Sequence, residues 1–288
     1  MVWQLGTVPY LNAEPLAAAL REPDAALLVG DAVGLQASIP AELLPQLLSG
    51  SLDAALVSTA GVLPYPELRI VPGMCVSSRG VVESIELYCR RPPEEVRTVA
   101  LDASSRSGLA LTRVLFAERW RRSPEFITLP PVLPEMLRQA DAALLIGNPA
   151  LQANVALERG EWPGLVEVRY DLGEEWDRLT GLPFVYAVWA SPVTRNGAPV
   201  DHARLTRVLE HSLEWGLRRR GLIASRGAEQ LSLPRDLCDR YLNSCIRYRL
   251  GPDERAGMEL FCRLAVEHGV LPPESAVRFV EPASAAVG

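Results

Sequence analysis

The sequence contains no lysine, so all 29 of its basic residues are arginines. Without lysine the chain cannot form a Schiff base with pyridoxal phosphate, cannot use a lysine nucleophile, and cannot build a phosphate-binding loop of the Walker type. Biased codon usage is the simplest explanation of this absence. The three chemistries are excluded whatever its cause.

Histidine and cysteine are also scarce, and neither is spaced for metal binding or catalysis. The histidines, His202, His211 and His268, have no paired spacing to a cysteine or a carboxylate, which predicts neither a metal site nor histidine-based catalysis. The cysteines include no C-x-x-C pair, so we expect small buried residues in a reducing compartment. They are Cys75, Cys89, Cys238, Cys245 and Cys262.

Long apolar runs and excess positive charge are missing as well. No stretch reaches about 18 uninterrupted apolar residues, so we expect no membrane span. Residues 1–20 lack the basic start, apolar centre and cleavage site of a secretory signal, which predicts a cytoplasmic protein. The net charge of −6 argues against a nucleic-acid partner, and the 48% of hydrophobic residues are typical of a folded chain.

Two segments of the chain resemble each other, at residues 42–58 and 134–147. In both, an amphipathic stretch ends in a small or polar residue, and Asp-Ala-Ala-Leu then opens a short apolar run, starting at Asp53 and at Asp141. This pattern predicts a helix that leads into a buried strand.

Each of these segments follows a similar beginning. Residues 5–8 and 98–101 read as strands, and each is followed by a polar turn and a helix, over 15–20 and 108–119 respectively. The chain therefore holds two units of strand, helix, variable segment, helix and strand. Strands that alternate with helices predict an α/β protein with parallel sheets and right-handed crossovers.

The last third of the chain has a different character. We expect a strand over 182–189, followed by helices over 203–220, 234–242 and 253–268. A natural assembly is a discontinuous first lobe of residues 1–88 and 187–288, with a second lobe of residues 89–186 inserted into it. The two crossing segments would then act as a hinge.

The loops that follow the first strand of each unit are candidate anion sites. Each points a helix N-terminus, with its unpaired N–H groups, toward the carboxyl edge of the sheet. In the second unit, Ser105 and Ser107 offer hydroxyl groups and Arg106 offers a guanidinium; in the first, Asn12 offers an amide. Two such sites facing each other would suit a ligand with two anionic groups. Helix capping for the serines, a surface ion pair for Arg106 and a turn role for Asn12 are the alternatives.

An acidic cluster of Asp171, Glu174, Glu175 and Asp177 is interpreted as a solvated face. Ser58 lacks the G-x-S-x-G frame of a hydrolase nucleophile.

Six segments, in order along the chain, resemble the chorismate dehydratases of the futalosine route to menaquinone. They cover residues 8 to about 190. They are Val8–Leu16, Gly80–Ser84, Leu101–Ser107, Asp141–Leu151, Tyr170–Gly173 and Thr180–Val185.

The resemblance implies a periplasmic-binding-protein-like, type II α/β fold, with two lobes of mixed, mainly parallel sheet flanked by helices and a ligand cleft between them. It implies a lyase that removes water from chorismate, a dicarboxylate, without cofactor or metal. Asn12 and Ser84 would be catalytic. The implied substrate-binding residues are Ser58, Ser105, Arg106, Ser107, Gly147, Asn148, Thr180, Gly181 and Pro183.

The chain departs from the family pattern at two places. It has Asn148 where the family often has Asp, and Ser105 or Gly108 where the family usually has Thr. The first departure puts an acid role at position 148 in doubt.

Three alternative functions share the predicted fold. One is the sister enzyme that acts on a cyclic dehypoxanthine futalosine product, although its opening motif differs. Another is a solute-binding protein, which would need export. The third is the effector-binding half of a transcription regulator, which would carry a helix-turn-helix.

Overall fold

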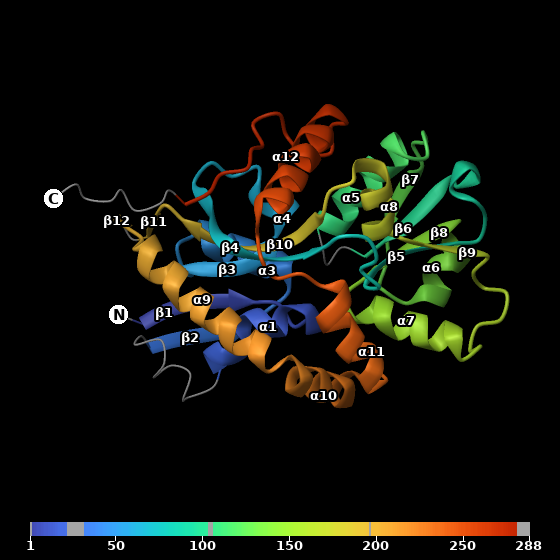
Figure 1. The fold of residues 1–288 in the computed structure, drawn as a ribbon. Coiled ribbons are helices and arrows are strands. Elements are labelled where there is room, and N and C mark those ends of the chain that lie inside the picture. Colours follow the sequence, from blue (N-terminus) through green and yellow to red (C-terminus); the bar gives the residue numbers. More distant parts are fainter. Residues whose placement is uncertain (1, 22–31, 103–105, 196, 281–288) are drawn as a thin grey trace.

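The computed structural model describes residues 2–21, 32–102, 106–195 and 197–280, and it contains two five-stranded sheets side by side (Figure 1). The first sheet has the order β2-β1-β3-β10-β4, with the bounds Ala32–Ala37, Val2–Thr7, Ala54–Ser58, Phe184–Pro192 and Leu68–Ser78. The second has the order β7-β6-β8-β5-β9, with the bounds Glu125–Thr128, Thr98–Leu101, Ala142–Ile146, Ile85–Cys89 and Val168–Asp171.

Helices surround both sheets. Those of the first lobe are η1 (Leu11–Ala13), α1 (Glu14–Ala17), η2 (Ala18–Arg21), α3 (Pro40–Leu48), α4 (Thr59–Val62), α9 (His202–Arg218), α10 (Arg220–Leu231), α11 (Arg235–Arg240), the π turn η4 (Tyr241–Cys245) and α12 (Pro252–Glu267). Those of the second are η3 (Pro93–Glu95), α5 (Arg106–Glu118), α6 (Leu133–Gln139), α7 (Asn148–Glu158) and α8 (Leu172–Thr180). A short ribbon pairs β11 (Thr194–Arg195) with β12 (Ala198–Pro199).

The internal repeat predicted from the sequence is confirmed. In both lobes the first strand runs parallel to the two strands that follow it, which gives the orders β2-β1-β3 and β7-β6-β8. The two aspartates of the repeat, Asp53 and Asp141, form equivalent hydrogen bonds in the two lobes. The Oδ2 of Asp53 accepts from the backbone N of Gln4 at 2.7 Å, and the Oδ2 of Asp141 accepts from the N of Thr98 at 3.3 Å. Each aspartate thus ties the start of the third strand to the first.

The chain exchanges lobes twice. β5 joins the second sheet antiparallel to β8, and β10 joins the first sheet antiparallel to β3. Because residues 85–89 pair in the second sheet and residues 184–186 lie in the first, we propose that the crossings are 79–84 and 181–183. Each segment lies a few residues before the predicted boundary, at 88 and at 187 respectively.

The three C-terminal helices expected from the sequence are present, but α10 was missed. Its buried residues are small, apart from Ile223, so the sequence has no broad apolar stripe there. One of them, Gly227, lies directly against Leu11: a β-carbon built at this glycine would be 2.5 Å from a Leu11 methyl group. Close packing of small residues, not amphipathic periodicity, holds this helix in place.

The interior departs from the prediction for the acidic cluster. Asp171 and Glu175 are buried, so the interpretation of this cluster as a solvated face is wrong for these two residues.

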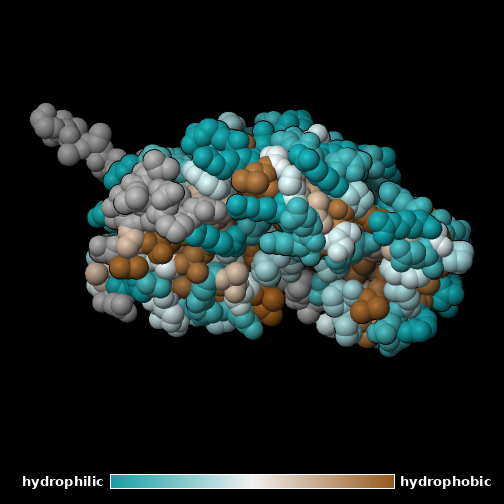
Figure 2. All heavy atoms as spheres, turned by 90° about the horizontal axis from the view of Figure 1, so that it is seen from below, coloured by the Kyte–Doolittle hydropathy of each residue, from teal (hydrophilic) through white to brown (hydrophobic). Residues whose placement is uncertain are grey.

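All five cysteines are buried and free. Among the described helices, none is long and apolar enough to span a bilayer. The underside of the molecule is mostly hydrophilic, with hydrophobic residues in separate groups (Figure 2).

Candidate active site

Residues of both lobes line a small cavity of about 50 Å³ between the two sheets. It lies where β1, β3 and β8 end, so its walls come from both sheets. None of its described lining residues carries a charge at neutral pH. They are Val8, Tyr10, Asn12, Leu56, Val57, Ser58, Val76, Ser84, Ile85, Ile146, Gly147, Tyr186 and Ala187.

A chain of hydrogen bonds connects the two residues predicted to be catalytic. Asn12, in the turn after β1, donates from Nδ2 to the Tyr241 hydroxyl at 2.9 Å. Tyr241 in turn donates to Oγ of Ser84 at 2.7 Å. Ser84 is 1% exposed, as is Tyr241, the first residue of the π turn. Burial raises the pKa of the Tyr241 hydroxyl, so this group keeps its proton and acts as a donor.

The backbone around Ser84 is held from two directions. The carbonyl of Ser84 accepts from the N of Gly147 at 2.7 Å. The Oδ2 of Asp171 accepts from the backbone N of Val82 at 2.9 Å and of Glu83 at 2.7 Å. Glu83 has a φ of +59°, in the left-handed region that non-glycine residues rarely adopt. The buried carboxylate therefore fixes a strained turn immediately before Ser84.

Ser58 and Ser107 meet across the lobes. Their hydroxyl oxygens are 2.8 Å apart, and Oγ of Ser107 also accepts from the N of Ala60 at 3.1 Å. Ser58 lines the cavity, whereas Arg106 lines a separate groove beside α4 and α5. Ser105 lies outside the described residues. The structure thus brings Ser58 and Ser107 together and directs Arg106 elsewhere.

Gly147 and Asn148 form the start of α7, facing the loop that follows β1. Gly147 has a φ of +70°, and a β-carbon built there would be 3.0 Å from the ring of Tyr10, so only glycine fits. The side chain of Asn148 accepts from the N of Leu11 at 3.1 Å and donates to the carbonyl of Pro9 at 3.2 Å. Asn148 therefore joins the two lobes beside the cavity.

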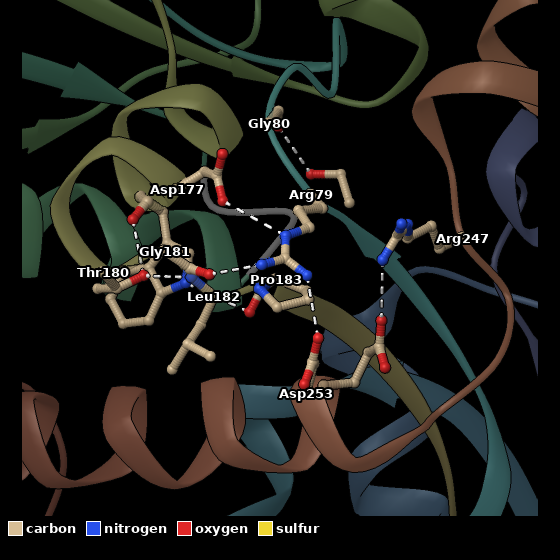
Figure 3. A network of polar contacts seen from close by, with 12 residues as sticks. Arg79, Gly80, Asp177, Thr180, Gly181, Leu182, Pro183, Arg247 and Asp253 are labelled. Atoms are coloured by element: carbon tan, nitrogen blue, oxygen red, sulfur yellow. Dashed lines mark hydrogen bonds and ion pairs between the residues drawn. The ribbon is translucent and has the colours of Figure 1, made fainter.

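The remaining predicted binding residues, Thr180, Gly181 and Pro183, lie away from the cavity lining, in a polar network at a crossing segment (Figure 3). Oγ1 of Thr180 donates to the carbonyl of Trp176 at 2.8 Å, and the carbonyl of Gly181 accepts from Arg79 at 3.0 Å. The carbonyl of Pro183 accepts from Nε1 of Trp176 at 3.3 Å. Their polar groups stabilise the turn after α8, and a binding role for them stays a prediction.

Three tyrosines at or beside the cavity were not among the predicted site residues. Tyr10 and Tyr186 line it, and the Tyr186 hydroxyl lies 2.8 Å from Oγ of Ser78. Burial raises the pKa of Tyr186 well above its ordinary value. Tyr10 lies within one of the motifs quoted above. Tyr241 carries no such signal, because 229 positions separate it from Asn12 and 157 from Ser84.

The lining suits an uncharged or anionic small molecule that is oriented by hydrogen bonds. Amide and hydroxyl groups can donate to carboxylate, ether and hydroxyl oxygens. The described lining residues include no carboxylate, imidazole or amine, so none of their side chains is suited to accept a proton from a ligand. Among the described residues, no three His, Cys, Asp or Glu side chains gather closely enough to hold a metal ion.

Solved structures with this fold include proteins of several kinds. Protein AF1704 from Archaeoglobus fulgidus is 14% identical with a TM-score of 0.71, covering 94% of this chain and 98% of that one. The Candida albicans CA3427 product, which has the generic periplasmic-binding-protein fold, is 8% identical with a TM-score of 0.67, covering 98% of each chain. SsuA, an alkanesulfonate-binding protein from Xanthomonas axonopodis pv. citri, is 16% identical with a TM-score of 0.66, covering 96% of each. The predicted fold is therefore confirmed.

Sequence comparison is more specific. A chorismate dehydratase from Thermus thermophilus is 32% identical over 266 residues, which covers 89% of this chain and 93% of the relative. Residues 3–267 also match the family model described as menaquinone biosynthesis. The chain therefore belongs to the menaquinone-biosynthesis family.

Proposed function

We propose that this protein is a chorismate dehydratase, a lyase that converts chorismate into 3-[(1-carboxyvinyl)oxy]benzoate during menaquinone biosynthesis. The chorismate dehydratase from Thermus thermophilus, with 32% identity over most of the chain, supports this assignment. The observation that carries it structurally is the meeting of Asn12 and Ser84, through Tyr241, in one uncharged cavity. The proposal keeps the cytoplasmic location expected from the sequence.

The chemistry matches a cavity without a protein base. Dehydration removes the C3 proton and the C4 hydroxyl group, forms a double bond between these carbons and makes the ring aromatic. The substrate's own enolpyruvyl carboxylate takes the C3 proton and passes it to the departing C4 hydroxyl group, which leaves as water. A well-positioned intramolecular base reaches effective molarities of about 10⁵ M or more. The protein then needs mainly to orient the substrate.

Asn12 and Ser84 supply that orientation in this proposal. The Asn12 amide holds the enolpyruvyl group above the C3 proton, and the Ser84 hydroxyl donates to the oxygen at C4, where negative charge develops as the bond breaks. The uncharged surroundings strengthen both hydrogen bonds, because the local dielectric constant is lower than that of water.

The test is to incubate the purified protein with chorismate and to follow the ultraviolet spectrum for an aromatic product. The wild-type protein should turn chorismate over. Asn12→Ala and Ser84→Ala should each lower kcat about 100-fold, which is typical for loss of one preorganised donor. Circular dichroism should show that both variants keep the fold.

Two results would contradict the proposal. Binding of chorismate without any turnover would favour a non-catalytic binding protein. Wild-type rates in both alanine variants would refute the assignment of the two residues.

A further inference from the structure

The hydroxyl of Tyr241 contacts both residues that the proposed reaction relies on, although it is not itself part of the cavity lining. It accepts from Asn12 and donates to Ser84, so the three groups form a directional chain of hydrogen bonds. The direction has consequences at both ends. With Nδ2 of Asn12 giving one hydrogen to Tyr241, its second N–H stays available to donate to the enolpyruvyl carboxylate. With its oxygen accepting from Tyr241, Ser84 keeps its own hydrogen to donate.

We propose that Tyr241 is a positioning residue, which holds the Asn12 amide and the Ser84 hydroxyl in the orientations in which both donate to the substrate. This inference rests on the proposed function, because it assigns the two groups to the reaction described above. Without the hydroxyl, the Asn12 amide could rotate by half a turn and the Ser84 hydroxyl could point in any staggered direction. Only a fraction of the molecules would then present the correct pattern.

The local backbone supports such a role. Tyr241 opens a π turn at the end of α11, and π turns within helices occur frequently at functional sites. The preceding residue, Arg240, forms an ion pair with Glu83 at 3.0 Å. Consecutive residues, 240 and 241, therefore contact consecutive residues, 83 and 84. This double contact fixes the C-terminal segment on the strained turn that carries Ser84.

A matched control is available a short distance along the chain. Tyr248 is 3% exposed, and its hydroxyl has no hydrogen-bond partner among the described residues. Tyr241→Phe and Tyr248→Phe each delete one buried hydroxyl from the same region. The first deletion breaks the connection between Asn12 and Ser84, whereas the second breaks no described hydrogen bond. A difference between the variants therefore reports on hydrogen-bond direction and not on the packing of the ring.

The experiment measures kcat and KM for chorismate in the wild-type protein and in both phenylalanine variants. We expect Tyr241→Phe to lower kcat about tenfold or more while KM stays within about twofold, since the lost interaction matters chiefly in the transition state. Tyr248→Phe should keep both constants within about twofold of wild type. Thermal unfolding of each variant checks that the fold is intact.

Several outcomes would overturn the inference. They are an unchanged kcat in Tyr241→Phe, a raised KM with unchanged kcat, and equal losses of kcat in both variants. Each of these leaves the proposed function standing if the wild-type protein is active. Absence of turnover in the wild-type protein would instead refute the proposed function, and the inference about Tyr241 would be refuted with it.

Discussion

At the scale of single residues, one buried acidic side chain lies outside the lining of the cavity. Glu86, on β5, is 3% exposed, and its Oε2 has no hydrogen-bond partner among the described residues. Nε of Arg169 lies 3.8 Å from this oxygen, too far for a hydrogen bond. Burial, together with the charge of the neighbouring Asp171, raises the pKa of Glu86 from 4.5 to about 8. Near neutral pH this carboxyl group therefore retains its proton in much of the population.

This shift predicts how stability depends on pH. Because the folded protein holds the proton more tightly than the unfolded chain, the stabilisation is fully present below pH 4.5 and is lost as the pH rises through about 8. Glu86→Gln has no such proton to lose. Its melting temperature should match wild type at pH 5 and exceed it by about 2–4 °C at pH 9, which corresponds to roughly 1 kcal/mol.

Scanning calorimetry across pH 5–9 checks this prediction. Glu158→Gln is the control, since Glu158 lines the same surface groove as Glu86 but its own side chain is exposed. A difference between Glu86→Gln and wild type that is the same at every pH would contradict the assigned cause.

At the scale of elements, close helix contacts depend on glycine. α9 crosses α1 at Gly216, where a built β-carbon would lie 2.0 Å from the carbonyl oxygen of Pro15. One turn earlier, Oγ of Ser212 donates to the carbonyl of Leu16 at 2.7 Å. Backbone atoms cannot move aside as a flexible side chain can. The contact between α9 and α1, the helix that follows Asn12, therefore requires glycine at position 216.

We predict that Gly216→Ala lowers the free energy of unfolding by about 2–3 kcal/mol, the range for overpacking, despite alanine's better helix propensity. Gly221→Ala is the matched control. Gly221 lies near the start of α10 with no atom within 4 Å of a built β-carbon. The free energy of unfolding of Gly221→Ala should rise by about 0.5–1 kcal/mol. Urea denaturation measures both, and equal effects in the two variants would show that packing against Pro15 is not the cause.

At the scale of the whole molecule, the lobes are joined directly across the cavity. Asn148 reaches from α7 to the backbone of Pro9 and Leu11, and Ser107 reaches from α5 to Ser58. Such contacts stabilise the closed arrangement of a two-lobed binding fold. A ligand that binds only to this arrangement gains affinity from every contact that favours it.

Asn148→Ala should therefore raise KM for chorismate by about 3- to 10-fold, equivalent to one net hydrogen bond, and change kcat less. Gln46→Ala is the control, because among the described residues the amide of Gln46 forms hydrogen bonds within the first lobe, with Gln36 and Glu42. Steady-state kinetics measures both. A lower kcat with unchanged KM in Asn148→Ala would contradict a role in closure.

Much of the fold could be predicted because its signals are local. The two Asp-Ala-Ala-Leu segments, the strands before them and the amphipathic face of α9 all depend on residues close together in the sequence. α10 was missed because small residues bury it without a broad apolar stripe. For the site, Asn12 was a candidate from its place after the first strand, and Ser58, Ser84 and Gly147 were named by resemblance. All four line one cavity.

What the sequence alone determined, then, is the repeated βαβ framework and the chemistry it excludes, since both follow from composition and short-range periodicity. Only the tertiary structure decided which polar groups meet. It brought Tyr241 between Asn12 and Ser84, and it kept Thr180, Gly181 and Pro183 in a turn away from the cavity. The physical reason is that Tyr241 lies 229 positions from Asn12 and 157 from Ser84, so these contacts depend on how the two lobes pack together. Their partners are set by the packing of whole elements, which no short stretch of sequence encodes.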